Sequence, residues 1–289
     1  MKTAIIIDST AYANSDIINH PDVYELKFTT TFEGGIEYYD SSDPDFLKEF
    51  YKKLEESSKL PTTSQPSIGK YEAAISDIIE KGYDQLLSIH LSAGLSGAFQ
   101  TAEMITNMHQ DEIKSRVIDS KGASVVIEAM IYQAIEMFEK NMDIDIVAEK
   151  LNWIADNSTI YLTVSDLDNL VKGGRLPASV AKVGKMLKIK PLLCIGIDGK
   201  IQLFDKVRTD KKMNKRFVEI VEEDLKNYPN GIMLGFAHTM DEKRMNESME
   251  FVTKSFPDLQ YKKGVLGPVI GTHTGTGAIG MGVIPIADY

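Results

Sequence analysis

The chain has 289 residues and a mass of 32.2 kDa; 43% of its residues are hydrophobic and 26% are charged. A chain of this size buries about three quarters of its unfolded surface, which provides a large core and excludes general disorder. The net charge of −10 excludes a general nucleic-acid binder. The single cysteine, Cys194, excludes a disulfide framework or a cysteine-based zinc site, and its apolar neighbours predict an inert core thiol.

Short apolar strands alternate with amphipathic helices through the first part of the chain. The strands are predicted at residues 3–7, 85–91 and 116–118. The helices are predicted at residues 44–57, 68–81, 98–109, 123–139 and 144–155, with Asp43 and Ser67 as N-caps and Gly82 as a helix stop. This alternation indicates a mainly parallel, doubly wound sheet, whose functional residues collect at the carboxyl ends of the strands.

The second part of the chain has a different order of elements. It begins with a predicted strand at 159–164 and a short helix at 166–171. The remaining elements are a hairpin of 189–197 and 200–207 turning at Asp198-Gly199, a helix at 210–226, a strand at 232–237, a helix at 240–254 and a final strand at 283–286. We therefore predict two α/β domains, residues 1–165 and 166–289.

Small hydroxyl residues follow three of the predicted strands. They lie in the loops 8–10, 92–97 and 119–120. Because the carboxyl ends of parallel strands meet at one edge of a sheet, these loops predict a site rich in neutral hydrogen-bond donors at that edge.

Charge is divided unevenly along the chain. Residues 1–165 hold 13 basic and 27 acidic side chains, whereas residues 166–289 hold 19 and 15. The segment 172–216 alone holds 13 basic side chains against 3 acidic ones. This basic segment is either a solvated surface that balances the acidic first half, or a docking face for an anionic ligand, an acidic partner or a membrane surface.

Motifs for nucleotides and metals are weak or missing. Residues 275–280 match G-x-G-x-x-G, but they lie too near the end of the chain to open the strand–helix unit that a dinucleotide site needs. No phosphate-binding loop motif is present, and the five histidines lack the spacing of metal ligands. No apolar run is long enough for a membrane span, so we expect a cytoplasmic protein.

Ser96 and His273 are the candidate reactive side chains. Ser96 follows a strand and opens a helix, much as a nucleophile elbow does, although the second glycine falls one residue early. An N-cap serine is the alternative interpretation. His273 lies in a loop of glycine and threonine, which favours a polar site over a core position.

Several segments, taken in order, resemble the DegV family across essentially the full length. They are Ile7-Asp-Ser-Thr10, Thr62-Thr-Ser-Gln-Pro-Ser67, Leu95-Ser-Gly-Ala-Phe-Gln100, Asp119-Ser120, Leu170-Val-Lys-Gly-Gly-Arg175, Lys206-Val-Arg208 and residues 271–277. The commoner family form has threonine where Ala98 stands. The resemblance implies two α/β domains with a long-chain fatty acid in a tunnel between them.

The same resemblance implies roles for particular residues. Thr63 and Ser96 hold the carboxyl group, together with their neighbours Thr62 and Gly97, and His273 reaches the same head group. Two further residues, Arg175 and Arg208, lie near the tunnel mouth within the basic segment, where they contact a phosphate or a partner protein.

The family includes the fatty-acid-binding subunit of bacterial fatty acid kinase. This resemblance implies a protein with no catalysis of its own and no cofactor besides the fatty acid, which presents the carboxylate to an ATP-using kinase subunit. The resulting acyl phosphate passes to an acyltransferase of phospholipid synthesis, with transient membrane contact and no nucleic-acid partner. Two alternatives stay open: a lipid hydrolase or acyltransferase that uses Ser96 and His273, and a fatty-acid sensor or buffer without a kinase.

Overall fold

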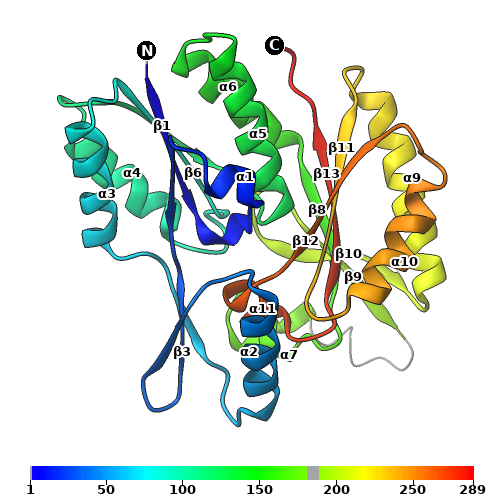
Figure 1. Cartoon of the computed structure of the whole chain (residues 1–289). Helices are drawn as coiled ribbons and strands as arrows, with labels where there is room; N and C mark the ends of the chain where they lie inside the picture. The colour runs from blue at the N-terminus through cyan, green and yellow to red at the C-terminus, as the bar shows by residue number, and fades with distance from the viewer. Residues whose placement is uncertain (1, 181–188) are drawn as a thin grey trace.

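The computed structural model describes residues 2–180 and 189–289, and the strands in these ranges form three sheets. A four-stranded sheet and a six-stranded sheet stand side by side, with helices α5 (Val125–Glu139) and α6 (Ile144–Asn157) between them (Figure 1). A small three-stranded sheet lies below, next to helix α2 (Pro44–Glu56) (Figure 1).

The four-stranded sheet is parallel throughout, in the order β2-β1-β6-β7, as predicted. Its strands are β1 (Thr3–Asp8), β2 (Val23–Leu26), β6 (Gln85–His90) and β7 (Lys114–Asp119). Successive residues of β1 enter two different cores: Ile5 and Ile7 pack toward α5 and α6, whereas Ala4 and Ile6 pack toward the opposite face. That face is covered by α3 (Ile68–Glu80) and α4 (Ala98–Met108), so the sheet is buried on both sides.

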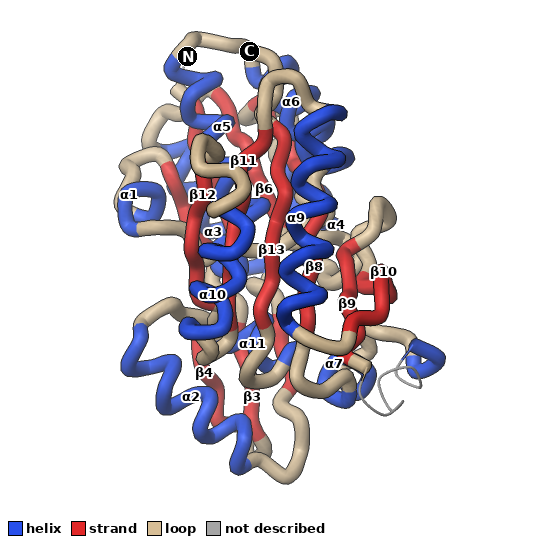
Figure 2. The backbone as a smooth tube through the Cα atoms, turned by 90° about the vertical axis from the view of Figure 1, so that its right-hand side faces the viewer, coloured by secondary structure: helices blue, strands red, loops and turns tan. Residues whose placement is uncertain are grey.

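The six-stranded sheet is mixed, with the order β10-β9-β8-β13-β11-β12. Its strands are β8 (Thr159–Thr163), β9 (Lys190–Ile195), β10 (Ile201–Val207), β11 (Ile232–His238), β12 (Gln260–Val265) and β13 (Ile279–Pro285). Helices α9 (Asp210–Asn227) and α10 (Glu242–Thr253) cover one face, and Figure 2 shows β13 running through the middle of the sheet. The hairpin turn at Asp198-Gly199 is confirmed.

Strand β8 belongs to this second sheet although it precedes the predicted domain boundary. It pairs with β13 on one side and with β9 on the other. The six-stranded sheet therefore takes one strand from within residues 1–165, and the division at residue 165 stays a prediction.

The three-stranded sheet was not predicted. It is antiparallel in the order β4-β3-β5 and consists of β3 (Thr29–Phe32), β4 (Ile36–Tyr39) and β5 (Thr62–Ser64). Short helical segments complete the described fold: η1 (Ser9–Ala11), α1 (Ser15–Ile18), α7 (Asp168–Lys172) and α11 (Pro268–Thr274).

The predicted helix boundaries agree with the structure to within two residues, and one of the two predicted N-caps differs. Asp43 caps α2 by accepting a hydrogen bond from the Phe46 amide at 2.8 Å, and Gly82 ends α3 in the left-handed conformation. Ser67 occupies the N-cap position of α3, but its side chain makes no capping hydrogen bond. No helix in the described ranges is long and apolar enough to cross a membrane.

Candidate functional site

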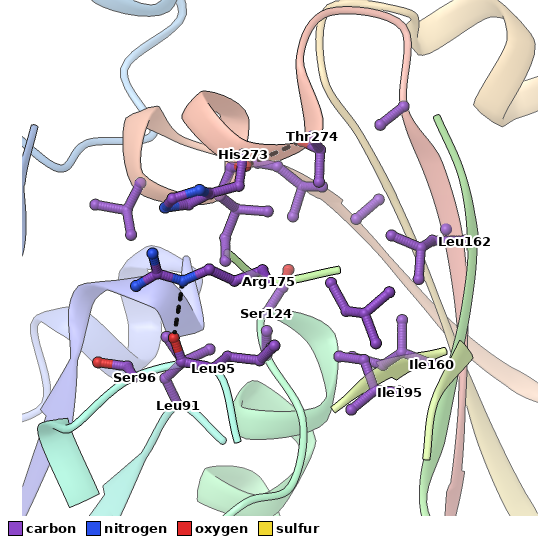
Figure 3. A pocket seen from close by; sticks show the side chains of 18 of the residues that line it. Leu91, Leu95, Ser96, Ser124, Ile160, Leu162, Arg175, Ile195, His273 and Thr274 are labelled. Atoms are coloured by element: carbon purple, nitrogen blue, oxygen red, sulfur yellow. Dashed lines mark hydrogen bonds between the residues drawn. The ribbon is translucent and has the colours of Figure 1, made fainter. Parts of the chain in front are cut away.

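A cavity of about 170 Å³ lies where the two large sheets come together (Figure 3). It is enclosed by α11, by the end of α7, by the loop that precedes α4 and by the first turn of α5. Its floor is the face of the six-stranded sheet opposite α9 and α10, with Ile160, Leu162 and Ile195 in the lining. This volume far exceeds the ~10–15 Å³ that one water molecule needs, so the cavity has room for an organic ligand.

Polar side chains gather at one end of this cavity. Figure 3 shows Ser96, Arg175 and His273 on one side and the sheet residues Ile160 and Ile195 on the other. Thr63 and Gln65 also line the polar end. The structure therefore brings together five polar residues from four separate segments of the chain.

His273 is held as a neutral ring at this polar end. It is only 9% exposed, and burial together with the charge of Arg175 lowers the pKa of His273 to about 4. Its Nε2 shares a hydrogen bond of 2.9 Å with the Thr63 hydroxyl, while its Nδ1 has no hydrogen-bond partner among the described residues. The ring thus keeps one free polar atom.

Gly173 makes room for that ring. A Cβ atom at this position would lie less than 3.0 Å from the Nδ1 and Cε1 atoms of His273, closer than real Cβ atoms come. The end of α7 therefore rests directly on the imidazole. Gly173 belongs to one of the segments that resemble the DegV family, but nothing in the sequence marks its contact with a residue one hundred positions later.

Arg175 is a cation without an acidic partner among residues 2–180 and 189–289. Its guanidinium donates to two backbone carbonyls, from Nε to Leu95 at 3.2 Å and from Nη1 to Gly173. Burial lowers the pKa of Arg175, and in the described part of the chain no carboxylate forms an ion pair with it. A half-buried, unpaired cation that lines a cavity favours an anionic ligand group.

Ser96 and Gly97 form the start of α4 at the cavity. The Ser96 hydroxyl accepts a hydrogen bond of 3.2 Å from the Ala98 amide. Gln65 lies over Gly97, since a Cβ at residue 97 would be 2.8 Å from the Gln65 Oε1, and its Nε2 donates to Thr101 at 2.6 Å. Gln65 was not among the predicted site residues, although it lies beside Thr63 in the same polar segment.

Two predicted site residues do not reach the cavity. Thr62 is exposed, because neighbouring residues of a strand point to opposite faces and Thr63 takes the inward position in β5. Arg208 is exposed just after β10 and does not line the cavity. Neither residue lines this cavity, which differs from the expectation that Thr62 helps to hold the carboxyl group; contact of Arg208 with a phosphate or a partner stays a prediction.

The three hydroxyl-rich loops have unequal roles. Only the loop 92–97 lines the cavity. Asp119 supports it from behind, because its carboxylate accepts a hydrogen bond of 3.0 Å from the Ala93 amide. The loop 8–10 is buried and does not line the cavity, which corrects the expectation that all three loops build the site directly.

A serine–histidine–aspartate chain does exist, but it lies inside the protein. His90 contacts the Asp8 carboxylate at 3.2 Å through Nδ1 and the Ser88 hydroxyl at 2.6 Å through Nε2. All three residues are 0% exposed and none lines the cavity. A hydrolase needs its nucleophile in contact with substrate, so these three hydrogen-bonded side chains have a structural role. They fix the end of β6, where the Leu91 amide also donates to Asp8.

A second buried carboxyl, Asp40, holds the start of α11. It accepts hydrogen bonds from the Ser9 hydroxyl at 3.0 Å, from the Tyr12 hydroxyl at 3.2 Å and from the Val269 amide at 3.1 Å. Burial raises the pKa of Asp40 to about 7. This network ties the helix that carries His273 to the first part of the chain.

Fold and cavity together define an α/β protein with a pocket for a small amphipathic molecule. The sequence model of the DegV family, described as a family of uncharacterised proteins, matches residues 2–286. A DegV domain-containing protein of Streptococcus pneumoniae is 32% identical over 288 residues, which cover 99% of this chain and 100% of that protein. The chain belongs to the DegV family, which confirms the resemblance.

Solved structures share the whole fold. A fatty acid binding DegV family protein from Streptococcus agalactiae superposes with a TM-score of 0.90, at 31% identity and with 99% of each chain covered. DegV from Bacillus subtilis, a fatty acid binding protein, gives a TM-score of 0.86 at 29% identity, covering 99% of this chain and 100% of its own. The predicted pair of α/β domains is confirmed.

Proposed function

We propose that this protein binds one long-chain fatty acid in the cavity and presents its carboxylate to a separate, ATP-using kinase subunit. The observation that carries the proposal is the distribution of polar groups: the cavity is mainly apolar and gathers Thr63, Ser96, His273 and Arg175 at one end. A ligand with a long apolar body and one anionic head matches this distribution. The relatives described as fatty acid binding proteins support the same ligand.

Burial of the acyl chain supplies most of the binding free energy. Each buried methylene contributes about 0.8 kcal/mol, so ten of them contribute on the order of 8 kcal/mol. The polar end then sets the orientation: His273 and Thr63 share one hydrogen bond, which leaves this neutral pair one proton to donate to the carboxylate, while Arg175 offsets its charge.

The kinase step is the finer part of the proposal. An oxygen of the bound carboxylate attacks the γ-phosphorus of ATP on the partner subunit, ADP leaves, and an acyl phosphate remains on this protein. An acyltransferase of phospholipid synthesis then consumes the acyl phosphate. The family resemblance supports this sequence of events, as does the basic segment 172–216, which reaches the polar end through Arg175.

Lipid analysis of the purified protein tests the ligand. We expect native mass spectrometry to show one bound fatty acid, and added palmitate or oleate to raise the melting temperature of delipidated protein. A folded, lipid-free protein that responds to neither fatty acid would overturn the proposal.

Two activity assays test the role. With ATP and a cognate kinase subunit, we expect acyl phosphate, whereas a plain buffer or sensor yields none. The wild-type protein and the variant Ser96→Ala should both fail to cleave an activated ester, whereas a serine hydrolase cleaves it and loses that activity in the variant.

A further inference from the structure

Part of the cavity floor consists of backbone without side chains. On β11 and β13, two neighbouring cross-strand pairs face α5 and the cavity: Gly235 with Gly282, and Ala237 with Gly280. Among these four residues only Ala237 has a side chain, which is a single methyl group. Gly280 and Gly282 also pair with Leu162 and Ile160 of β8, which lie at the apolar end in Figure 3.

The side chain of Val125 covers the first of these pairs, Gly235 with Gly282. A Cβ at residue 235 would lie less than 3.0 Å from the Val125 Cβ, and a Cβ at residue 282 would lie 2.9 Å from its Cγ2. The valine side chain therefore rests directly on the two glycines. It is 5% exposed and lines the cavity.

The position of Val125 is fixed from the other side as well. It is the first residue of α5 and follows Ser124, which has a φ of 51° and a ψ of −119°. The Ser124 amide donates to the Thr10 carbonyl at 2.8 Å, so the first part of the chain holds this turn in place. Val125 is thus a rigid part of the wall.

We infer that Val125 is the end wall that sets the length of the acyl chain. The inference rests on the proposed fatty-acid binding. With the carboxylate at the polar end, the chain runs toward β8 and β13, and its methyl end reaches the Ala237–Gly280 pair. In the next pair along the sheet, Gly282 still lines the cavity but Val125 covers Gly235, so a longer chain has no room beyond Gly282.

The variant Val125→Ala removes two methyl groups and uncovers the Gly235–Gly282 pair. We expect the preferred saturated chain to become about two carbons longer, because each further buried methylene strengthens binding roughly fourfold. The measurement is the set of dissociation constants for even-numbered saturated fatty acids from lauric to arachidic acid. Val125→Ile should have the opposite effect. Because the sheet blocks the added carbon of isoleucine on one side, that carbon enters the cavity, and the preferred fatty acid should become shorter.

Val126→Ala is the matched control. Val126 is the next residue of the same helix and is 1% exposed, but it does not line the cavity. It should lower stability in a similar way and leave the chain-length profile unchanged. A wild-type protein that binds no fatty acid overturns the proposed function and this inference with it. A wild-type protein that binds the series, with the same profile in Val125→Ala and Val126→Ala, overturns the inference alone.

Discussion

Gly173 shows how a single residue without a side chain controls the chemistry of another. Its φ of −75° is open to any residue, so alanine at this position meets His273 but introduces no backbone strain. We expect Gly173→Ala to displace the imidazole from Thr63 and to weaken fatty-acid binding roughly tenfold. Titration of delipidated protein with palmitate measures this loss.

A double-mutant cycle separates this mechanism from general damage. When His273 is already alanine, Gly173→Ala should cost no further affinity, because the ring that it displaces is gone. Gly69→Ala, with nothing within 4 Å of the added Cβ, serves as the matched control. Equal losses with and without His273 would contradict the contact.

Thr63 and Thr62 offer a second comparison between neighbouring residues. Valine at position 63 keeps the shape of the side chain but leaves His273 Nε2 without its hydroxyl partner, so we expect a loss of about 1–3 kcal/mol in fatty-acid affinity. Valine at position 62 changes an exposed side chain, and binding should stay as in the wild type. Equal effects of the two variants would show that Thr63 has no special contact with the head group.

Helix α11 is held in place by a carboxyl group that titrates near neutral pH. Asp8 of β1, Tyr12 just after η1 and Tyr51 of α2 also face Asp40, and none of them supplies positive charge. Because the pKa of Asp40 is about 7 in the folded protein and near 3.8 when unfolded, the folded state binds the extra proton between these values. Asp40 thus makes the folded protein less stable as pH rises from about 4 to about 7.

The variant Asp40→Asn removes this titration while keeping the shape of the side chain. The free energy of unfolding of the wild type should fall relative to the variant by up to about 1.4 kcal/mol per pH unit between those values. Urea unfolding of both proteins across that pH range measures the difference. Parallel pH profiles would mean that Asp40 is ionised in the folded protein throughout.

Elements with strong local patterns were predictable from the sequence, and elements defined by distant partners were not. Strand β1 contains the apolar run Ala4 to Ile7, and β6 is mostly apolar and buried along its whole length, as a sheet buried on both faces requires. By contrast, β4 is mostly exposed and only 4 residues long, and β12 is a polar edge strand with Lys262 and Lys263, so neither shows the pattern of a buried strand.

The candidate site likewise combines residues that a local sequence pattern predicts with contacts that depend on distant partners. Thr63, Ser96 and His273 could be predicted because small polar residues gather in the segments that carry them. The contacts of Gly173 with His273 and of Val125 with Gly235 join residues about one hundred positions apart, and no local pattern marks them. The outward position of Thr62 was not predictable, because the sequence of a three-residue strand does not show which of its residues face inward.

At the scale of the whole molecule, Arg175 and Arg208 belong to one basic segment, but the fold places the first in the cavity lining and the second on the surface. Arg175 lines the cavity, so Arg175→Ala should weaken both fatty-acid binding and phosphorylation. Arg208 is exposed, so Arg208→Ala should leave fatty-acid binding unchanged and slow only the encounter with the proposed kinase subunit.

Salt distinguishes the two effects. At about 0.15 M ionic strength the Debye length is about 8 Å, so long-range attraction by Arg208 is screened and the difference between wild type and Arg208→Ala should shrink. The measurement is the rate of acyl phosphate formation with a cognate kinase subunit at low and moderate salt. Equal rates for wild type and Arg208→Ala at low salt would assign Arg208 to the solvated surface.

The position of β13 late in the sequence determines the order in which the two large sheets form during synthesis. The strands of the four-stranded sheet all lie between residues 3 and 119, so that sheet can assemble while the rest of the chain is still being made. The six-stranded sheet cannot be completed until β13 is synthesised, because β13 follows the other described strands in the chain and yet lies between β8 and β11 in the sheet. Until it arrives, both neighbours expose unpaired edges and the glycine floor of the cavity is missing. A ribosome-bound chain therefore holds a finished first sheet long before its cavity is complete.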